Sequence, residues 1–397
     1  MIFLGDTIVA CVTGLVKEEE MSHTIKRSIL LLLALSFLAS AAVFNFNHRG
    51  VSHAVTALSV YFGSDNDFFY ALDAPHGTLR WTYQYQLGGN TWSPAVVVNG
   101  VLFFEVTNSS STAVVSLRND GSKRWTFTFP SQTSGADAVA VANNLVYFAV
   151  NSKVSTSNID ALNAAGGSTA WTYAAGANDI FGNPLAVNGV LYVAEHSLTS
   201  GSTHSLDVLN ATNGSVIGNY QLPATPSTNL TIANGVIYFG GPAGTLYAVN
   251  ASNGSLIWSS QVDGGPVSTP TIVNSLVYFA AANDFVTAVN ASDDSLNWHY
   301  LVGKAFAATA SPVVVSGVVY IGCMNTVMYA INASTGALVW KTKTGTPITT
   351  TAAIKNGIIH VGLQNGTLRT LNTSNGIQRW YYHTGGTIYS SSPPVVA

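Results

Sequence analysis

Residues 247–258 read YAVNASNGSLIW, and variants of this stretch recur along the chain. Each copy has an alternating apolar run, a polar step with a glycine, and a short segment ending on an aromatic anchor. The anchors are Trp81, Trp125, Trp171, Tyr220, Trp258, Trp298, Trp340 and Trp380. Successive anchors lie about 40 residues apart, which suits a propeller blade and is too long for a leucine-rich or hexapeptide repeat. The sequence therefore predicts eight blade-like repeats.

The strands inside each repeat can be placed from the turns. Two apolar runs flank Asn-Gly in AVVVNGVLFF (95–104) and TIANGVIYFG (231–240). This pair tolerates positive φ at both central positions of a type I′ hairpin. A third strand follows, and the chain then reverses at a glycine into a fourth strand that carries the anchor. We expect an all-β fold, an eight-bladed β-propeller of four-stranded antiparallel blades.

The two ends of the repeat region predict how the ring closes. The chain ends SSSPPVVA (390–397), which matches the first strand in TWSPAVVV (91–98) but stops before the Asn-Gly turn. We predict that residues 393–397 complete the blade opened by residues 59–85, because closure removes the last exposed sheet edges. The alternative is that Val51 to Thr56 supplies this strand.

The N-terminal region predicts export. Residues 21–41 combine a basic start, an apolar core and the small-residue site Ala39-Ser40-Ala41, as a secretory signal peptide does. We interpret residues 1–20 as an over-extended start, with a second apolar segment as the alternative, and residues 42–397 as one domain. The expected location is periplasmic, extracellular or at the cell surface. An uncleaved segment would instead anchor the chain to a membrane.

Composition narrows the classes of partner. Only 8% of residues are charged and the net charge is −3, so no global field favours nucleic acid or an anionic membrane. Of the two cysteines, Cys11 and Cys323, only the second follows the signal peptide, and no internal disulfide is expected. The most consistent interpretation is a monomer that binds another envelope or extracellular protein.

The repeat pattern Y-A-x-[ND]-A-x-x-G-x-x-x-W resembles the repeat of PQQ-type propellers over about residues 51–397. This family includes quinoprotein alcohol dehydrogenases and the periplasmic propeller lipoprotein of the outer-membrane β-barrel assembly machinery. The resemblance implies the propeller fold, whereas one repeat serves both enzymes and scaffolds. The dehydrogenases typically have a vicinal cysteine pair beside the cofactor, and this chain has no adjacent cysteines.

Few residues suggest a metal or a cofactor. The loop GSDNDFF (63–69) presents Asp65 and Asp67, which could bind Ca²⁺, but it lacks the terminal Glu and fixed Gly of a calcium loop. The histidines are scattered over several blades and lack zinc-ligand spacing. We therefore expect no metal, no cofactor and no catalytic residues. PQQ with Ca²⁺ is expected only if the chain is a quinoprotein.

Charge placement suggests a recognition surface. The loops on one side of the ring hold an excess of acids: Asp65, Asp67, Glu105, Asp137, Asp179, Glu195, Asp263 and Asp284, against Lys153, Lys304 and Lys343. Arg80, Arg118, Lys123, Arg124, Lys355, Arg369 and Arg379 lie toward the other side. We hypothesise that Trp92, Asp179, Phe181 and Glu195 form a recognition face of exposed aromatic rings and acids, with ordinary solvated loops as the alternative.

Two interpretations of function follow. The first is a protein-binding, scaffold or sensing propeller without catalytic activity. The second is a small PQQ-dependent alcohol or sugar dehydrogenase. Several Asn-x-Ser/Thr sequons lie in the repeat turns, including those at Asn250 and Asn332, and turn geometry explains them without glycosylation.

Overall fold

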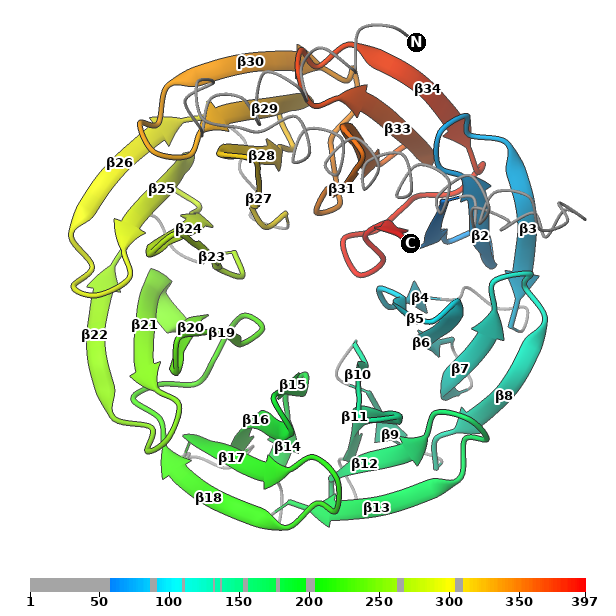
Figure 1. Cartoon of the computed structure of the whole chain (residues 1–397), viewed down its shortest axis with the longest axis vertical. Helices are drawn as coiled ribbons and strands as arrows, with labels where there is room; N and C mark the ends of the chain where they lie inside the picture. The colour runs from blue at the N-terminus through cyan, green and yellow to red at the C-terminus, as the bar shows by residue number, and fades with distance from the viewer. Residues whose placement is uncertain are drawn as a thin grey trace, which may run out of the picture. The chain divides into compact units, whose positions relative to one another are not determined.

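The computed structural model describes residues 58–85, 91–108, 111–130, 133–135, 138–152, 156–175, 179–197, 204–262, 268–303 and 310–397. These residues form eight antiparallel sheets arranged in a ring (Figure 1). The only helical segment among them is the short 3-10 turn η2 (Pro242–Gly244), so none of the described helices could cross a membrane. The predicted eight-bladed propeller is confirmed.

Each blade runs outward from a short inner strand to a long outer strand. Blade 1 contains β35 (Val395–Val396), β1 (Ser59–Gly63), β2 (Phe68–Asp73) and β3 (Leu79–Gln84). Blade 2 contains β4 (Thr91–Trp92), β5 (Val96–Val98), β6 (Val101–Thr107), β7 (Thr112–Arg118) and β8 (Lys123–Thr128). Blade 3 contains β9 (Thr133–Ser134), β10 (Ala140–Ala142), β11 (Leu145–Ser152), β12 (Asn158–Asn163) and β13 (Thr169–Ala174). Blade 4 contains β14 (Asp179–Phe181), β15 (Leu185–Val187), β16 (Val190–Ser197), β17 (His204–Asn210) and β18 (Val216–Gln221).

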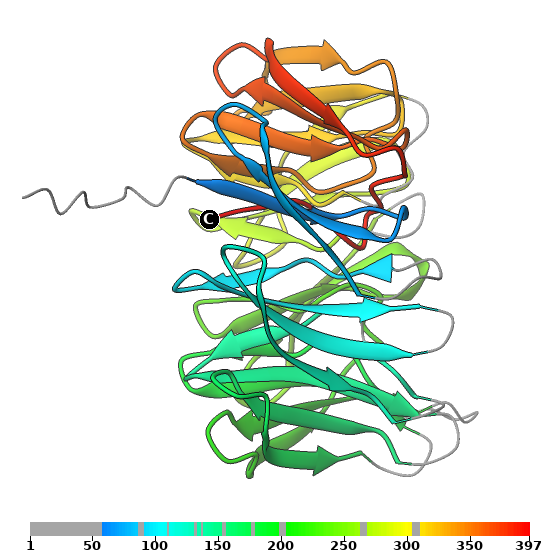
Figure 2. The same cartoon turned by 90° about the vertical axis from the view of Figure 1, so that its right-hand side faces the viewer.

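The other four blades have four strands each. Blade 5 contains β19 (Thr231–Ala233), β20 (Val236–Gly240), β21 (Thr245–Asn250) and β22 (Leu256–Gln261). Blade 6 contains β23 (Thr271–Val273), β24 (Leu276–Ala280), β25 (Phe285–Asn290) and β26 (Leu296–Leu301). Blade 7 contains β27 (Val313–Val315), β28 (Val318–Gly322), β29 (Val327–Asn332) and β30 (Leu338–Lys343). Blade 8 contains β31 (Ala353–Lys355), β32 (Ile358–Gly362), β33 (Thr367–Asn372) and β34 (Gln378–His383). Figure 2 shows the ring from its edge, with the strands crossing its thickness.

The ring closes through the C-terminal strand. β35 pairs with β1, with Val396 opposite Val60 and Val395 opposite Tyr61. The amide of Ser59 also donates to the carbonyl of Ala397 at 2.9 Å. The prediction of C-terminal closure is confirmed. Val51–Thr56, the predicted signal peptide and residues 1–20 all lie outside the described residues.

The hairpin turns have the backbone geometry that the sequence predicts. Asn99 and Gly100 have φ values of 50° and 73°, and Asn234 and Gly235 have 51° and 77°. Positive φ at two successive residues defines the type I′ turn, which matches the twist of the flanking strands.

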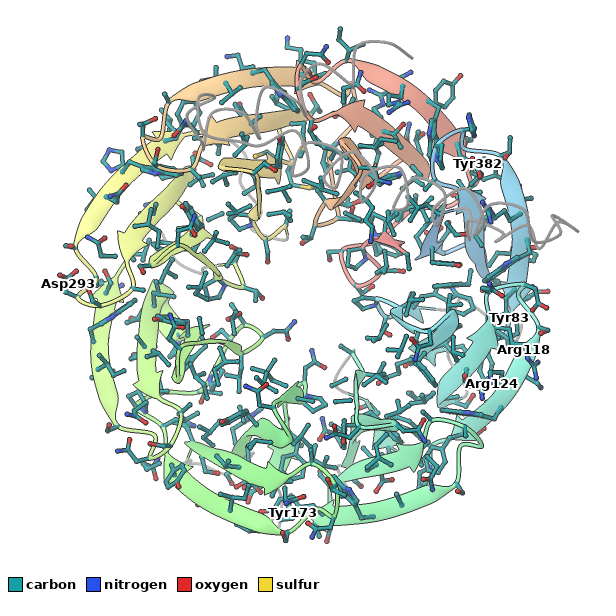
Figure 3. The ribbon with its side chains drawn as sticks, in the orientation of Figure 1. Tyr83, Arg118, Arg124, Tyr173, Asp293 and Tyr382 are labelled. Atoms are coloured by element: carbon teal, nitrogen blue, oxygen red, sulfur yellow. The ribbon has the colours of Figure 1, made fainter. Side chains whose placement is uncertain are left out.

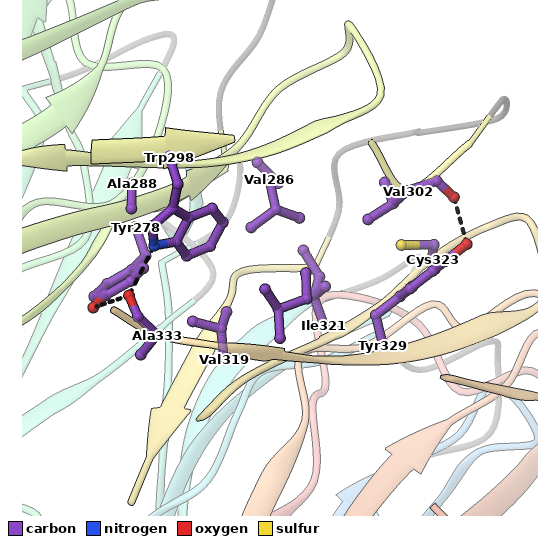
Figure 4. Close-up of a cluster of buried hydrophobic side chains, with 12 residues drawn as sticks. Tyr278, Val286, Ala288, Trp298, Val302, Val319, Ile321, Cys323, Tyr329 and Ala333 are labelled. Carbon is purple, nitrogen blue, oxygen red and sulfur yellow. Dashed lines mark hydrogen bonds between the residues drawn. The ribbon is translucent and has the colours of Figure 1, made fainter. Parts of the chain in front are cut away.

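The repeat tryptophans join neighbouring blades. The indole of Trp298 donates to the carbonyl of Ala333 in the next blade at 2.8 Å, and Tyr278 donates to the same oxygen at 3.1 Å (Figure 4). Equivalent indole bonds link blades 1, 2, 3, 5 and 7 to the next blade, and that of Trp380 in blade 8 reaches Ala74 in blade 1 at 3.1 Å. Blade 4 has Tyr220 at the anchor position in place of a tryptophan. Eight separate apolar clusters fill the contacts between neighbouring blades, one at each contact around the ring.

Candidate functional site

Trp92 belongs to the packing between blades 1 and 2. Its side chain is 2% exposed, and its indole donates to the carbonyl of Ser64 at 3.1 Å. Its ring centroid lies 5.6 Å from that of Phe69. The expectation of an exposed anchor is therefore wrong for Trp92, because burying this large apolar ring stabilises the blade contact.

Phe181 is buried in the same way between blades 3 and 4. Its side chain is 1% exposed and its ring lies 5.9 Å from that of Tyr173. The side-chain amide of Asn151 fixes its backbone, donating to its carbonyl at 2.8 Å and accepting from its amide at 2.9 Å. Phe181 is therefore not exposed for recognition, contrary to the sequence-based hypothesis.

Asp179 and Glu195 lie together in blade 4, on strands β14 and β16. Asp179 is half-buried and pairs in register with Ser197, while Glu195 pairs with Phe181. Glu195 is only 9% exposed, so it is neither the exposed acid of the recognition hypothesis nor the solvated loop acid of its alternative.

Glu195 instead joins a buried acid pair. Asp207 is fully buried and lies opposite Val193, two residues from Glu195 on the same face of the sheet. The amide of Asn219 and the phenol of Tyr173 hydrogen-bond to Asp207. Ser205 donates to Glu195 at 3.2 Å. Tyr173 reaches the pair from blade 3, and Figure 3 shows it beside the outer strands of blades 3 and 4.

The electrostatics of this acid pair follow from its burial. Desolvation, followed by the charge of Glu195, raises the pKa of Asp207 to about 7. Burial first, and then the two carboxyl groups, raises the pKa of Tyr173. Two adjacent carboxylates cannot both ionise cheaply in a dry environment. The acid pair Glu195–Asp207 can therefore hold or release one proton near neutral pH.

The sequence hypothesis missed Asp207 and Tyr173, although a repeat alignment contained the signal for Asp207. In blades 1, 5 and 7 the equivalent position of the third strand is Tyr70, Tyr247 or Tyr329. In blade 3 the equivalent position is also an acid, Asp160, which is 9% exposed and accepts a hydrogen bond from Thr172. Acids are seldom buried without a partner, so an acid at this position indicates a buried polar contact.

The other side of β16 borders a small polar pocket of ≈ 250 Å³. His196, Asn183, Ser227 and Asn229 are among its lining residues. Burial, followed by the neighbouring His204, lowers the pKa of His196. The amide of Asn183 donates to Asn229 at 2.8 Å. The pocket therefore offers neutral hydrogen-bonding groups to a small polar molecule.

The Asp65–Asp67 loop takes part in ring closure. The amide of Asp65 donates to Thr387 at 3.0 Å, and its carboxylate accepts from Tyr389 at 3.2 Å. Asn66 donates to the carbonyl of Thr384 at 2.6 Å. Among the described residues, no group of three or more His, Cys, Asp or Glu side chains could hold a metal ion.

The outcome differs among the other residues that the sequence analysis placed on the acidic face. Glu105 is buried inside β6 and is not a loop acid, which corrects the sequence prediction. Asp137, Asp263, Lys153 and Lys304 lie outside the described residues. Cys323 is buried, and desolvation raises the pKa of its thiol to about 12.

The fold and these sites define the class of protein, a closed propeller built from PQQ-type repeats. The family described as outer membrane protein assembly factor BamB matches residues 64–233, 226–350 and 302–397, and the chain belongs to this family. No curated protein matches the chain.

Solved structures share the fold at low identity. BamB from Moraxella catarrhalis is 17% identical, with a TM-score of 0.56, over 76% of this chain and 89% of that chain. Quinohemoprotein alcohol dehydrogenase ADHIIG from Pseudomonas putida HK5 is 12% identical, with a TM-score of 0.59, over 78% and 71%. A europium-containing methanol dehydrogenase is 11% identical, with a TM-score of 0.62, over 86% and 83%. The fold is thus common to assembly factors and dehydrogenases.

Proposed function

We propose that this chain is an exported, non-catalytic propeller that binds another protein of the cell envelope or the extracellular space. Its family is described as an outer membrane protein assembly factor, and the match extends from residue 64 to the C-terminus. The resemblance to BamB of Moraxella catarrhalis covers 89% of that protein. These similarities support a partner in an envelope assembly complex.

The observation that carries the proposal is that the groups that could have bound a metal or a cofactor form hydrogen bonds to other parts of the propeller. The Asp65–Asp67 loop bonds to the C-terminal segment that closes blade 1. His204 bonds to Thr225 at 2.7 Å, and His360 lies within bonding distance of the carbonyl of Ala74 at 3.3 Å. Groups with these internal partners contribute to the rigidity of the ring, as a binding scaffold requires.

A quinoprotein dehydrogenase is the second candidate, favoured by kinship to the quinohemoprotein and methanol dehydrogenases. In that case Asp65 and Asp67 would have to supply carboxylate oxygens for Ca²⁺. The sequence departs from those enzymes because its only cysteines are Cys11 and Cys323, so it has no vicinal pair.

A titration of the full chain with PQQ and Ca²⁺ tests the proposal. Absorbance and melting temperature are followed together, because a ligand that binds only the folded state raises its melting temperature. An apo quinoprotein dehydrogenase serves as the positive control. We expect neither signal to saturate. A saturable change at one equivalent, abolished in D65N/D67N, would overturn the scaffold function in favour of the dehydrogenase.

A further inference from the structure

The outer strands of the eight blades form a wall around the ring. These strands are β3, β8, β13, β18, β22, β26, β30 and β34, and together they carry six Lys or Arg residues and no Asp or Glu. Over the full sequence the acids outnumber the bases, with 18 against 15. The wall is therefore selectively cationic in a chain whose net charge is −3.

All six cations lie on four consecutive blades. We call this half of the wall, formed by β30, β34, β3 and β8, the cationic arc. Its charged residues are Lys341, Lys343, Arg379, Arg80, Lys123 and Arg124. Figure 1 shows the four strands following one another around the circumference, and Figure 3 shows Arg124 on this side of the ring. The other four outer strands carry no charged residue.

The rest of blades 7 and 8 strengthens this asymmetry. Residues 310–397 contain five Lys or Arg residues and no Asp or Glu. Residues 126–309, which run from the end of blade 2 through blade 6, contain two bases and nine acids, of which Asp160, Glu195 and Asp207 are buried. The ring is thus polarised from one side to the other, and charge of one sign concentrated on one surface attracts partners of the opposite sign.

Most of these cations are available to a partner. Lys123, Lys341, Lys343 and Arg379 are exposed. The ion pairs found among the described residues both involve Asp73, which binds Arg80 at 2.7 Å and His76. Cations without a neighbouring carboxylate have lost little water and can exchange it for an anionic ligand.

We propose that the cationic arc binds an acidic, extended protein segment. This inference deepens the proposed scaffold function, on which it rests, by naming the chemistry of the partner. The arc spans half the circumference of a convex ring, so a flat bilayer would reach only part of it, whereas an extended chain can follow it.

A second copy of the chain fits this surface poorly. Its acids are absent from the outer strands, and Glu105, Asp160, Glu195 and Asp207 are buried. The outer strands of one ring therefore present no acidic surface to the cationic arc of another ring. Charge complementarity favours a different protein over self-association.

Fluorescence anisotropy with a labelled peptide of alternating Glu and Thr tests this proposal. The full chain is titrated with this probe and with a control peptide of alternating Gln and Thr. We expect saturable binding of the acidic probe only, weakening as salt is raised from about 50 to 200 mM, because salt screens exposed charges.

Two variants with the same change in net charge locate the binding surface. K341Q/K343Q removes two cations from the arc, whereas R118Q/K355Q removes two exposed cations outside the wall strands. We expect K341Q/K343Q to weaken binding about five- to tenfold and R118Q/K355Q to leave it nearly unchanged. If the K341Q/K343Q protein has a lower melting temperature than the wild type, the K123Q/R379Q variant is tested in its place.

Four results would overturn the proposal: no binding, equal weakening by the two variants, tighter binding to anionic phosphatidylglycerol vesicles, or tighter binding to duplex DNA. Any of them would remove the acidic-peptide partner while leaving the scaffold function in place. Binding of PQQ at one equivalent would overturn the scaffold function without changing the peptide result, so the two failures can be told apart.

Discussion

Glu105 and Gly135 illustrate, at the scale of single residues, how neighbouring blades fit together. Gly63 lies under the indole of Trp92, and Gly322 lies under the side chain of Ile348 from the next blade. Between blades 2 and 3 the sizes are reversed, because Glu105 fills the space and Gly135 faces its carboxylate. At each of these contacts a glycine leaves room for the larger side chain that faces it, as close packing demands.

Replacing Gly135 with Ala should therefore destabilise the ring. A Cβ at this position would overlap the carboxylate of Glu105, and overpacking of this kind costs about 1 to 3 kcal/mol. Adding E105A should recover part of that free energy, which a double-mutant cycle in urea measures. G166A is the matched control, because a Cβ there meets no atom within 4 Å. A G135A protein as stable as the wild type would contradict this packing.

The acid pair Glu195–Asp207 should make stability depend on pH. Burial, and then Glu195, raises the pKa of Asp207 to about 7, whereas an unfolded Asp titrates near 4. Between about pH 4 and 7 the folded state therefore binds one proton that the unfolded state does not. The stabilisation that this protonation gives is complete below pH 4 and is lost as the pH rises through 7.

Asn at position 207 mimics the protonated acid. D207N should therefore be more stable than the wild type at pH 8, by about 1 to 3 kcal/mol, and should flatten the dependence between pH 4 and 7. Urea unfolding at several pH values measures this. D293N, at an exposed turn, is the control with the same charge change. An unchanged pH profile in D207N would show that Asp207 does not hold the proton.

At the scale of elements, a hydroxyl group links the first and second strands in several blades. A backbone amide at or near the end of the second strand donates to a Ser or Thr that precedes the first strand. These pairs are Gly63–Ser392, Glu105–Ser93, Gly240–Thr228, Ala280–Ser268 and Gly362–Thr350. At the ring closure this bond joins the two ends of the described repeat region.

Removing the hydroxyl at the closure should be costly. Ser392 accepts from the buried amide of Gly63 at 2.7 Å. S392A leaves that amide without a partner, which should lower the free energy of unfolding by about 1 to 3 kcal/mol. S390A, at an exposed residue, should change it little. Equal stability of S392A and the wild type in thermal unfolding would mean that water replaces the hydroxyl.

The sequence predicts these elements unequally well. Asn-Gly turns and the anchor residues recur, so the repeat pattern predicts the strands and the closing role of residues 393–397. The burial of Trp92 and Phe181 was not predictable in the same way. They lie on β4 and β14, which have 2 and 3 residues. Strands this short show no alternation, so their buried face cannot be read from the pattern.

At the scale of the whole molecule, the sequence analysis assigned charge to the two loop faces of the ring. The structure adds a second axis, from blade to blade around the circumference, and places six cations on one half of the wall. Glu105, Glu195 and Asp207 do not act as surface charges because they are buried. The burial of these acids depends on contacts between neighbouring blades. The sequence alone does not specify those contacts for each residue.

Closure by β35 should make the ring unfold as one unit, and Cys323 can report this. Cys323 lies in blade 7, away from the closing strand in blade 1, and is 2% exposed. Burial raises the pKa of its thiol to about 12, so the reactive thiolate is scarce in the folded state. Alkylation at this residue therefore requires the blades to open.

Deleting residues 393–397 should speed alkylation of Cys323 by more than about tenfold, because loss of the closing strand raises the population of the open ring. Mass spectrometry of the Cys323 peptide, with iodoacetamide under native conditions, follows the reaction separately from Cys11. The S390A protein should react at the wild-type rate, and every variant should react fully in urea. An unchanged rate in the deletion variant would mean that blade 7 opens independently of the closure, and that the ring is a series of separately stable blades.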